Sequence, residues 1–133
     1  MSTFDYSADD ILDAQFGSSH SSQFPSTYYG ALLTAAPTDA GGGTEGGYPE
    51  YARSAVTNID ANFPPASGRE KTHANPIVFP TPSIDTPDFT VFAWYRHVTA
   101  DQGLSWMYLP VPVSALAGKQ LFVPVGAWTR SIP

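Results

Sequence analysis

The sequence predicts a mainly β protein: a single antiparallel β-sandwich domain with a short N-terminal helix and arm. The 133 residues include 13 prolines and 11 glycines against 6 lysines and arginines, a balance typical of many short segments joined by turns. Seven tyrosines, eight phenylalanines and three tryptophans supply the bulky side chains that sheets bury. The length is sufficient for one domain with a core of its own, and no cysteine is present to cross-link it.

The N-terminal segment, 1–26, is predicted to be an arm that contains one short helix. A helical stripe of apolar side chains runs along it, and Gly17 is a natural end for the helix. A helix of about ten residues is marginal alone, so it needs a surface to pack on, either its own domain or a neighbouring subunit. We favour the neighbour, and expect the arm to contact it through five side chains: Phe4, Tyr6, Ile11, Leu12 and Phe16.

The remaining residues, 27–133, are predicted to form the β-sandwich domain, with six or seven short strands. Strands are expected over 27–34, 51–57, 76–80, 89–98, 104–111, 120–125 and 127–132, with an irregular connection over 58–74. The strongest of them carries large apolar groups on both faces, with Phe89 expected on the same face as Val91 and Tyr95. The strand that follows it is expected to return as its antiparallel partner.

Five glycines lie in the stretch 33–53 (LTAAPTDAGGGTEGGYPEYAR), and some of them fit a G-x-G-x-x-G spacing. A dinucleotide-binding loop joins a buried strand directly to a helix whose N-terminus meets the phosphates. Here six residues separate the strand from the first glycine, a second strand pattern follows, and Glu45 would repel a phosphate. We therefore interpret the glycines as a structural turn between two strands: Gly41, Gly42, Gly43, Gly46 and Gly47.

The same stretch carries a resemblance to a known family. TYYGALLT followed by PTDAGGGTEGG and YAR is similar to the signature of a widespread family of small virion proteins of tailed phages and prophages. The similarity covers nearly the whole chain, from ILDAQFG to a closing pair of strands around Gly126, and departs from the family at Tyr48-Pro49-Glu50. Members are described as virion structural, tail-fibre or head-decoration proteins, and the resemblance implies no catalytic residues.

The polar residues do not form a pattern that supports catalysis or a metal site. His20, His73 and His97 lie on three different segments, without the spacing of a ligand set. No G-x-S-x-G turn accompanies the abundant serines. Asp9 and Asp10 suit the positive end of a helix dipole. We expect no enzyme activity, no metal, no cofactor and no small-molecule ligand.

Aromatic residues on the predicted strands leave one alternative open, because exposed rings could build a carbohydrate-binding face. Their strands also carry valine, leucine and phenylalanine, which favours a core or a subunit interface for most of them. The residues concerned are Tyr28, Tyr29, Trp94, Tyr95, Trp106 and Tyr108.

The net charge of −6 is unevenly distributed, because residues 1–52 carry seven acids and no lysine or arginine. Such an acidic front would be repelled by nucleic acid and by anionic lipid, and we expect neither as a partner. It could favour a basic protein neighbour, or serve only solubility. No apolar run has the roughly twenty residues that a membrane span requires.

These observations favour a non-enzymatic virion structural protein of a tailed phage, specifically a capsid decoration (cement) protein that binds and stabilises the head shell. Its expected partners are the major capsid protein and copies of itself, arranged as a homotrimer. We expect it on the outer surface of the capsid, after synthesis in the host bacterial cytoplasm. The alternative is a tail-associated or tail-fibre subunit that contacts host glycans. A third hypothesis, a glycan hydrolase with its carboxylates on loops, would need a pair of them in a cleft.

Overall fold

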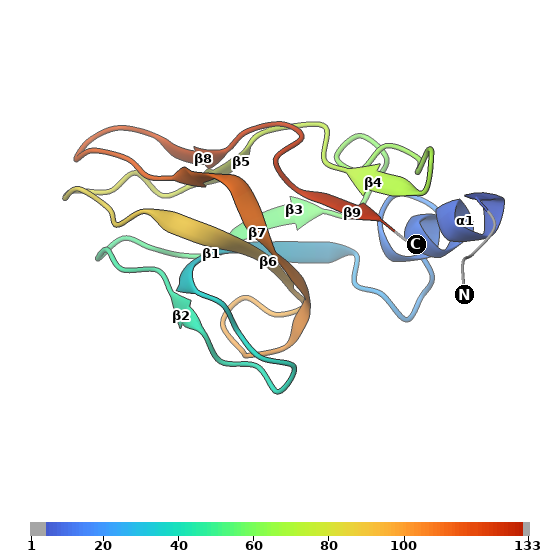
Figure 1. The fold of residues 1–133 in the computed structure, drawn as a ribbon, viewed down its shortest axis with the longest axis horizontal. Coiled ribbons are helices and arrows are strands. Elements are labelled where there is room, and N and C mark those ends of the chain that lie inside the picture. The colour runs from blue at the N-terminus through green and yellow to red at the C-terminus, as the bar shows by residue number, and fades with distance from the viewer. Residues whose placement is uncertain (1–4, 132–133) are drawn as a thin grey trace.

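The computed structural model describes residues 5–131 and shows a mainly β protein with one short helix (Figure 1). Antiparallel sheets pack together as a single sandwich, which confirms the predicted fold class. The elements are α1 (Asp5–Gln15), β1 (Thr27–Ala35), β2 (Thr44–Glu45), β3 (Ser54–Thr57), β4 (Glu70–Thr72), β5 (Ile77–Phe79), β6 (Phe89–Tyr95), β7 (Gly103–Val113), β8 (Leu121–Val123) and β9 (Thr129–Ser131).

The largest sheet has five strands, and every pairing in it is antiparallel. Strand β1 lies between β6 on one side and both β2 and β3 on the other. Strand β7 pairs with β6 and forms an outer edge of the sheet. Two smaller sheets, β4 with β9 and β5 with β8, face the large sheet, and α1 lies beside β4 and β9 at one end of the molecule (Figure 1).

Two short strands were not predicted. Strand β2 lies inside the glycine stretch, and β4 lies inside the connection 58–74 that the sequence indicated as irregular. Each has only two or three residues, too few for an alternating pattern. Each is a strand because of its pairing, β2 with β1 and β4 with β9. The last two strands form as expected, but β8 pairs with β5 and β9 pairs with β4, not with one another.

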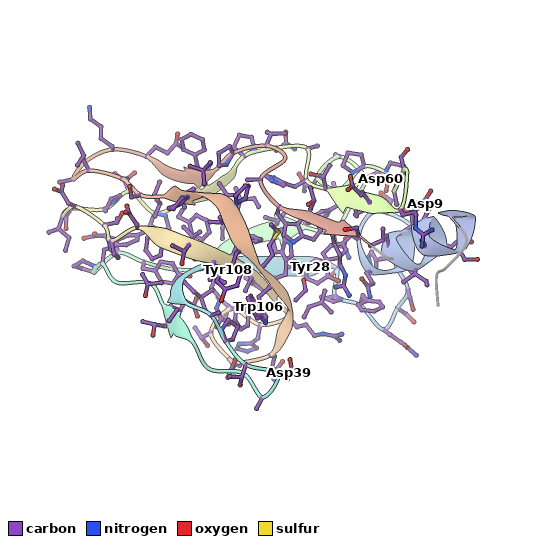
Figure 2. The ribbon with its side chains drawn as sticks, viewed as in Figure 1. Asp9, Tyr28, Asp39, Asp60, Trp106 and Tyr108 are labelled. Carbon is purple, nitrogen blue, oxygen red and sulfur yellow. The ribbon has the colours of Figure 1, made fainter. Side chains whose placement is uncertain are left out.

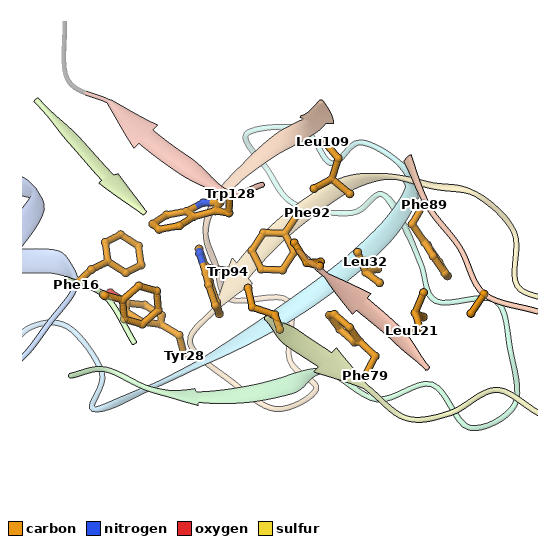
Figure 3. Close-up of a cluster of buried hydrophobic side chains, with 14 of the residues drawn as sticks. Phe16, Tyr28, Leu32, Phe79, Phe89, Phe92, Trp94, Leu109, Leu121 and Trp128 are labelled. Carbon is orange, nitrogen blue, oxygen red and sulfur yellow. The ribbon is translucent and has the colours of Figure 1, made fainter. Parts of the chain in front are cut away.

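The main core lies between the large sheet and the two small ones, and aromatic rings dominate it (Figure 3). Ring centroids lie 4.8 Å apart between Phe16 and Tyr28, and 4.9 Å apart between Phe16 and Trp128. Gly30 makes room for the edge-to-face pair of Phe92 and Trp94, because a Cβ there would lie 3.0 Å from the Phe92 ring. The helix, the large sheet and the segment before β9 therefore share one core.

A smaller apolar cluster lies on the other face of the large sheet: Ala31, Leu33, Val91, Ala93 and Tyr95. The prediction that Phe89 shares this face was wrong, because Phe89 belongs to the main core. The pairing register between β6 and β7 shifts between Phe89 and Val91, which interrupts the strict alternation of side chains along β6. Both faces of β6 are nevertheless buried, as predicted.

Candidate functional site

Helix α1 is packed on the chain's own β domain. The side chains of Leu12 and Phe16 are fully buried there, and Ile11 remains 44% exposed. Phe4 lies outside the described residues, and the structure does not describe the side chain of Tyr6. Of the described side chains expected to contact a neighbour, Ile11 alone is exposed in this conformation.

An ion pair between a buried lysine and a partly exposed aspartate also ties α1 to the domain. The Lys71 ammonium group donates to Asp13 Oδ1 at 2.6 Å, and the Lys71 side chain has no solvent exposure. The backbone N–H of Ala66 donates to the same carboxylate oxygen at 2.8 Å. A buried lysine without its carboxylate would be strongly unfavourable. Strand β4, which carries Lys71, therefore depends on Asp13 of α1, 58 residues earlier in the chain.

The end of α1 is held by side chains from the β domain. The Gln15 carbonyl accepts hydrogen bonds from the Tyr28 hydroxyl at 2.7 Å and from Asn58 Nδ2 at 3.1 Å. The Gly17 N–H donates to Asn58 Oδ1 at 2.6 Å. Terminal carbonyls that a helix cannot satisfy by itself are thus satisfied by tertiary contacts.

The glycine stretch folds back along β1. Strand β2 pairs with the end of β1, where Leu33 lies opposite Glu45 and Ala35 opposite Thr44. All five glycines have positive φ, from 75° to 132°: Gly41, Gly42, Gly43, Gly46 and Gly47. L side chains avoid this region of backbone conformation.

Gly43 is also packed too closely against β1 to leave room for a side chain. A Cβ at this position would lie 2.9 Å from the Ala35 carbonyl oxygen and 2.9 Å from Leu33 Cδ2. At Gly42, whose φ is nearly the same, a Cβ would meet nothing within 4 Å. The loop therefore packs on β1 and on the smaller apolar cluster through Gly43.

Arg53, with a side chain only 6% exposed, joins this loop to the turn between β6 and β7. Its Nε and Nη2 each donate to the Glu45 carboxylate at 2.9 Å. Its Nη1 donates to the carbonyls of His97 at 2.9 Å and Ala100 at 2.8 Å. The guanidinium also lies 3.6 Å above the centre of the Tyr95 ring. These contacts use the whole fork of the arginine, which a lysine could not do.

Two further contacts hold the glycine loop in place, one at Glu45 and one at Gly42. The Tyr51 hydroxyl donates to Glu45 Oε2 at 2.7 Å and accepts from the Leu32 N–H, and burial, followed by the Glu45 contact, raises the Tyr51 pKa. The Gly42 N–H donates to Asp101 Oδ2 at 2.9 Å. A backbone donor that a phosphate would need is thus already used by a carboxylate of the same chain.

A groove of about 580 Å³ lies where the turn 37–41 faces β7. Its lining includes Trp106, the buried Tyr95, and two exposed acids, Asp39 and Asp101. Trp106 and Tyr108 lie on β7 opposite Ala93 and Val91, so their side chains share the face of the smaller apolar cluster. Figure 2 shows both rings on β7, with Asp39 on the loop beyond them.

The six aromatic residues of the predicted strands divide into two groups. Tyr28, Trp94 and Tyr95 are buried and Tyr29 is partly buried, as expected for most of them. Trp106 and Tyr108 are 39% and 63% exposed. The signal that could have found them is their spacing of two residues on a strand that contains Pro110 and Pro112, since proline within a strand is typical of a sheet edge.

The comparison with known families decides the class of protein. The family model of the podophage GP4 fiber I protein gp80 matches residues 2–131, which is nearly the whole chain. The chain belongs to this family. It is therefore a phage virion structural protein, the coarser class that the resemblance in the glycine stretch had indicated. No curated protein sequence matches the chain.

In this fibre-family chain, much of the acidic front is used internally. Four of its seven acids accept hydrogen bonds from other parts of the domain: Asp9, Asp13, Glu45 and Glu50. The N–H and hydroxyl of Ser83 lower the pKa of the Glu50 carboxyl. Two of the four also pair with cations of the same domain, Asp13 with Lys71 and Glu45 with Arg53, so their charge is compensated within the chain.

Both His73 and His97 form hydrogen bonds within the domain. His73 Nδ1 lies 2.7 Å from the Asn75 carbonyl, its Nε2 accepts from the Trp128 N–H at 3.3 Å, and burial lowers its pKa. His97 Nδ1 accepts from the N–H groups of Thr99 and Ala100 in the turn. Within residues 5–131 no three His, Asp or Glu side chains gather as a metal site, and no described helix is long and apolar enough to span a membrane.

Proposed function

We propose that the protein is a non-enzymatic subunit of a podophage tail fibre. The observation that carries this proposal is the match of residues 2–131 to the family of the podophage GP4 fiber I protein gp80. The domain supplies a rigid β scaffold, since α1, the glycine stretch and the β6–β7 turn are all fixed to it by buried contacts. Its free apolar side chains lie on surfaces that a neighbouring protein or the host could contact.

Such surfaces are present on the described chain outside α1. Val78 and Phe122 lie opposite each other on β5 and β8, and each remains more than 40% exposed. Trp106, Tyr108 and Val111 are exposed along β7. Two separate apolar surfaces suit a subunit that holds a neighbour with one and leaves the other free.

Copy number and location in the particle test the proposal. Purified virions should contain only a few copies of the protein for each particle, and gold-labelled antibodies against it should bind at the tail. Quantitative mass spectrometry against the coat protein supplies the copy number. A protein absent from purified virions would contradict any virion role.

Capsid decoration, which the sequence favoured, predicts the opposite result. Its copy number would be comparable with that of the coat protein, and the antibodies would cover the head. The internal use of Asp13 and Glu45 and the burial of Phe16 weaken the two features that favoured it, an acidic front and a free arm.

A further inference from the structure

The groove of about 580 Å³ runs along the free edge of β7 and not over one of its faces. Its lining includes every residue from 101 to 107, although neighbouring residues of a strand point to opposite faces of the sheet. Ala93 and Tyr95 of the smaller apolar cluster line it on one side, and Trp128 of the main core lines it on the other. A groove that follows a strand edge fits an extended peptide laid beside the strand.

The first part of β7 is an unprotected edge. Within the described residues, only β6 exchanges backbone hydrogen bonds with residues 103–109. Edge strands commonly carry prolines or charged residues that discourage further pairing. Pro110 and Pro112 lie in the last part of β7, whereas residues 103–109 include neither a proline nor a charged residue. The outward backbone groups of this part are therefore open to pairing with another strand.

Arg130 of β9 lines the same groove and has no partner of opposite charge in the described chain. Its guanidinium forms no hydrogen bond or ion pair with a described residue, and burial lowers its pKa. Lys71 and Arg53, by contrast, are paired with carboxylates. Arg130 Nη1 is buried, but the residue as a whole is partly exposed, so a carboxylate can reach the rest of its fork from the groove.

Two acids at the groove limit the negative charge that a partner can bring. Asp101 accepts a hydrogen bond from the Gly42 N–H, and Asp39 is exposed on the turn 37–41. The whole chain carries a formal net charge of −6, so a polyacidic segment would be repelled. A strand with a single carboxylate, placed to face Arg130, fits this distribution of charge. The next side chain of that strand would point to the opposite face and cover Trp106, which is 39% exposed.

We propose that a strand of another protein extends the sheet at residues 103–109, with its one acidic side chain paired to Arg130 and the adjacent apolar side chain packed on Trp106. Main-chain hydrogen bonds supply the affinity, and these two side-chain contacts select the sequence. A second copy of β7 is a poorer occupant, because residues 103–113 contain no acid to offer Arg130. The proposal goes beyond the fibre role and does not depend on where in the particle the protein lies.

The test uses the purified full chain and an array of capped seven-residue peptides in which valine alternates with threonine. One threonine is replaced in turn by glutamate, by its neutral twin glutamine, or by lysine. Arg130→Gln is the groove variant. Lys119→Gln is the matched control, because it removes the same charge at an exposed residue that does not line the groove. Fluorescence polarisation gives the affinities, and amide hydrogen exchange shows which strand edge the peptide protects.

We expect a glutamate peptide to bind wild type and Lys119→Gln about tenfold more tightly than its glutamine twin, and the difference to vanish in Arg130→Gln. The bound peptide should slow exchange within residues 103–109 and leave β2 and β3 unchanged. If Arg130→Gln does not fold, the ranking of glutamate over glutamine and lysine on wild type, together with the exchange pattern, decides the matter.

Three results would overturn the proposal. The first is that no peptide binds wild type at millimolar concentration, and the second is that glutamate and glutamine peptides bind equally. The third is protection of residues 103–109 that rises with protein concentration alone, which would assign the edge to a second copy. Antibody labelling of the virion is independent of these measurements, so failure of the fibre proposal can be recognised separately.

Discussion

The N-terminal helix and the edge strand β7 both carry aromatic or aliphatic side chains at regular spacing. Those of the helix segment are mostly buried in the domain, whereas those of β7 are exposed to solvent. Phe16 of the helix segment is fully buried and contacts three other rings within 5.1 Å. Tyr108 of β7 is 63% exposed. The helix is therefore part of the core, and β7 is where apolar surface remains free. An apolar stripe in a sequence indicates that these side chains will pack against another surface. Only the fold shows whether that surface is part of the same chain, as it is for α1.

The largest expected effect is at Phe16. Phe16→Ala should lower the free energy of unfolding by about 3–5 kcal/mol, because it opens a cavity among Tyr28, Phe63 and Trp128. Urea unfolding followed by tryptophan fluorescence measures the change. Ile11→Ala is the control on the exposed side of α1. Equal effects of the two substitutions would mean that the helix is not packed on the domain.

Asp13→Asn should cost nearly as much, about 3 kcal/mol, because it leaves the Lys71 ammonium group buried without its negative partner. The matched control is Asp10→Asn, which changes an exposed acid of the same helix. Chemical unfolding of the two variants gives the comparison. A loss at Asp13 no greater than at Asp10 would show that the ion pair does not tie the helix to β4.

Gly43→Ala should destabilise more than Gly42→Ala. Both glycines have φ near 86°, so each alanine pays a conformational cost of about 1–2 kcal/mol, but only the Cβ at Gly43 meets backbone at 2.9 Å. Melting temperatures of the pair isolate the effect of close packing. Identical melting temperatures would contradict the packing of the loop on β1.

A smaller effect should follow the protonation of His73, whose Nε2 accepts from the Trp128 N–H. Its pKa is lowered in the folded state, so below about pH 6.5 the unfolded chain binds a proton that the folded chain does not. Stability should therefore fall as the pH drops from about 7.5 to 5.5, by at most about 1.4 kcal/mol per pH unit. His73→Gln should flatten this slope, as chemical unfolding at several pH values would show.

The smallest effect should be at β7. Tyr108→Ala should change the free energy of unfolding by less than about 1 kcal/mol, because the ring already contacts solvent over most of its surface. The same urea experiment as for Phe16→Ala gives the value. A loss of several kcal/mol would show that β7 belongs to the core and is not a free surface.

These contrasts also mark what the sequence could predict. The pair β6 and β7 was predictable, because two long segments rich in aromatic and apolar residues flank a short turn. The stripe of Leu12 and Phe16 was visible too, but its partner was not, since the pocket among Tyr28, Phe63 and Trp128 is built by residues distant in the sequence. Likewise β4 depends on a lysine whose carboxylate comes from α1. Pro110 and Pro112 are typical of an edge strand, so the edge position of β7 was visible in part, but no local pattern encodes the order of the other strands.

Hydrogen exchange of the free protein tests most directly whether the N-terminal helix is part of the folded core. The account predicts that amides near Leu12 and Phe16 exchange as slowly as those of β6, and that all are released together when the domain unfolds. If the helix amides exchanged within seconds while those of β6 stayed protected, the segment would be a detachable arm, and the distinction drawn between α1 and β7 would be wrong.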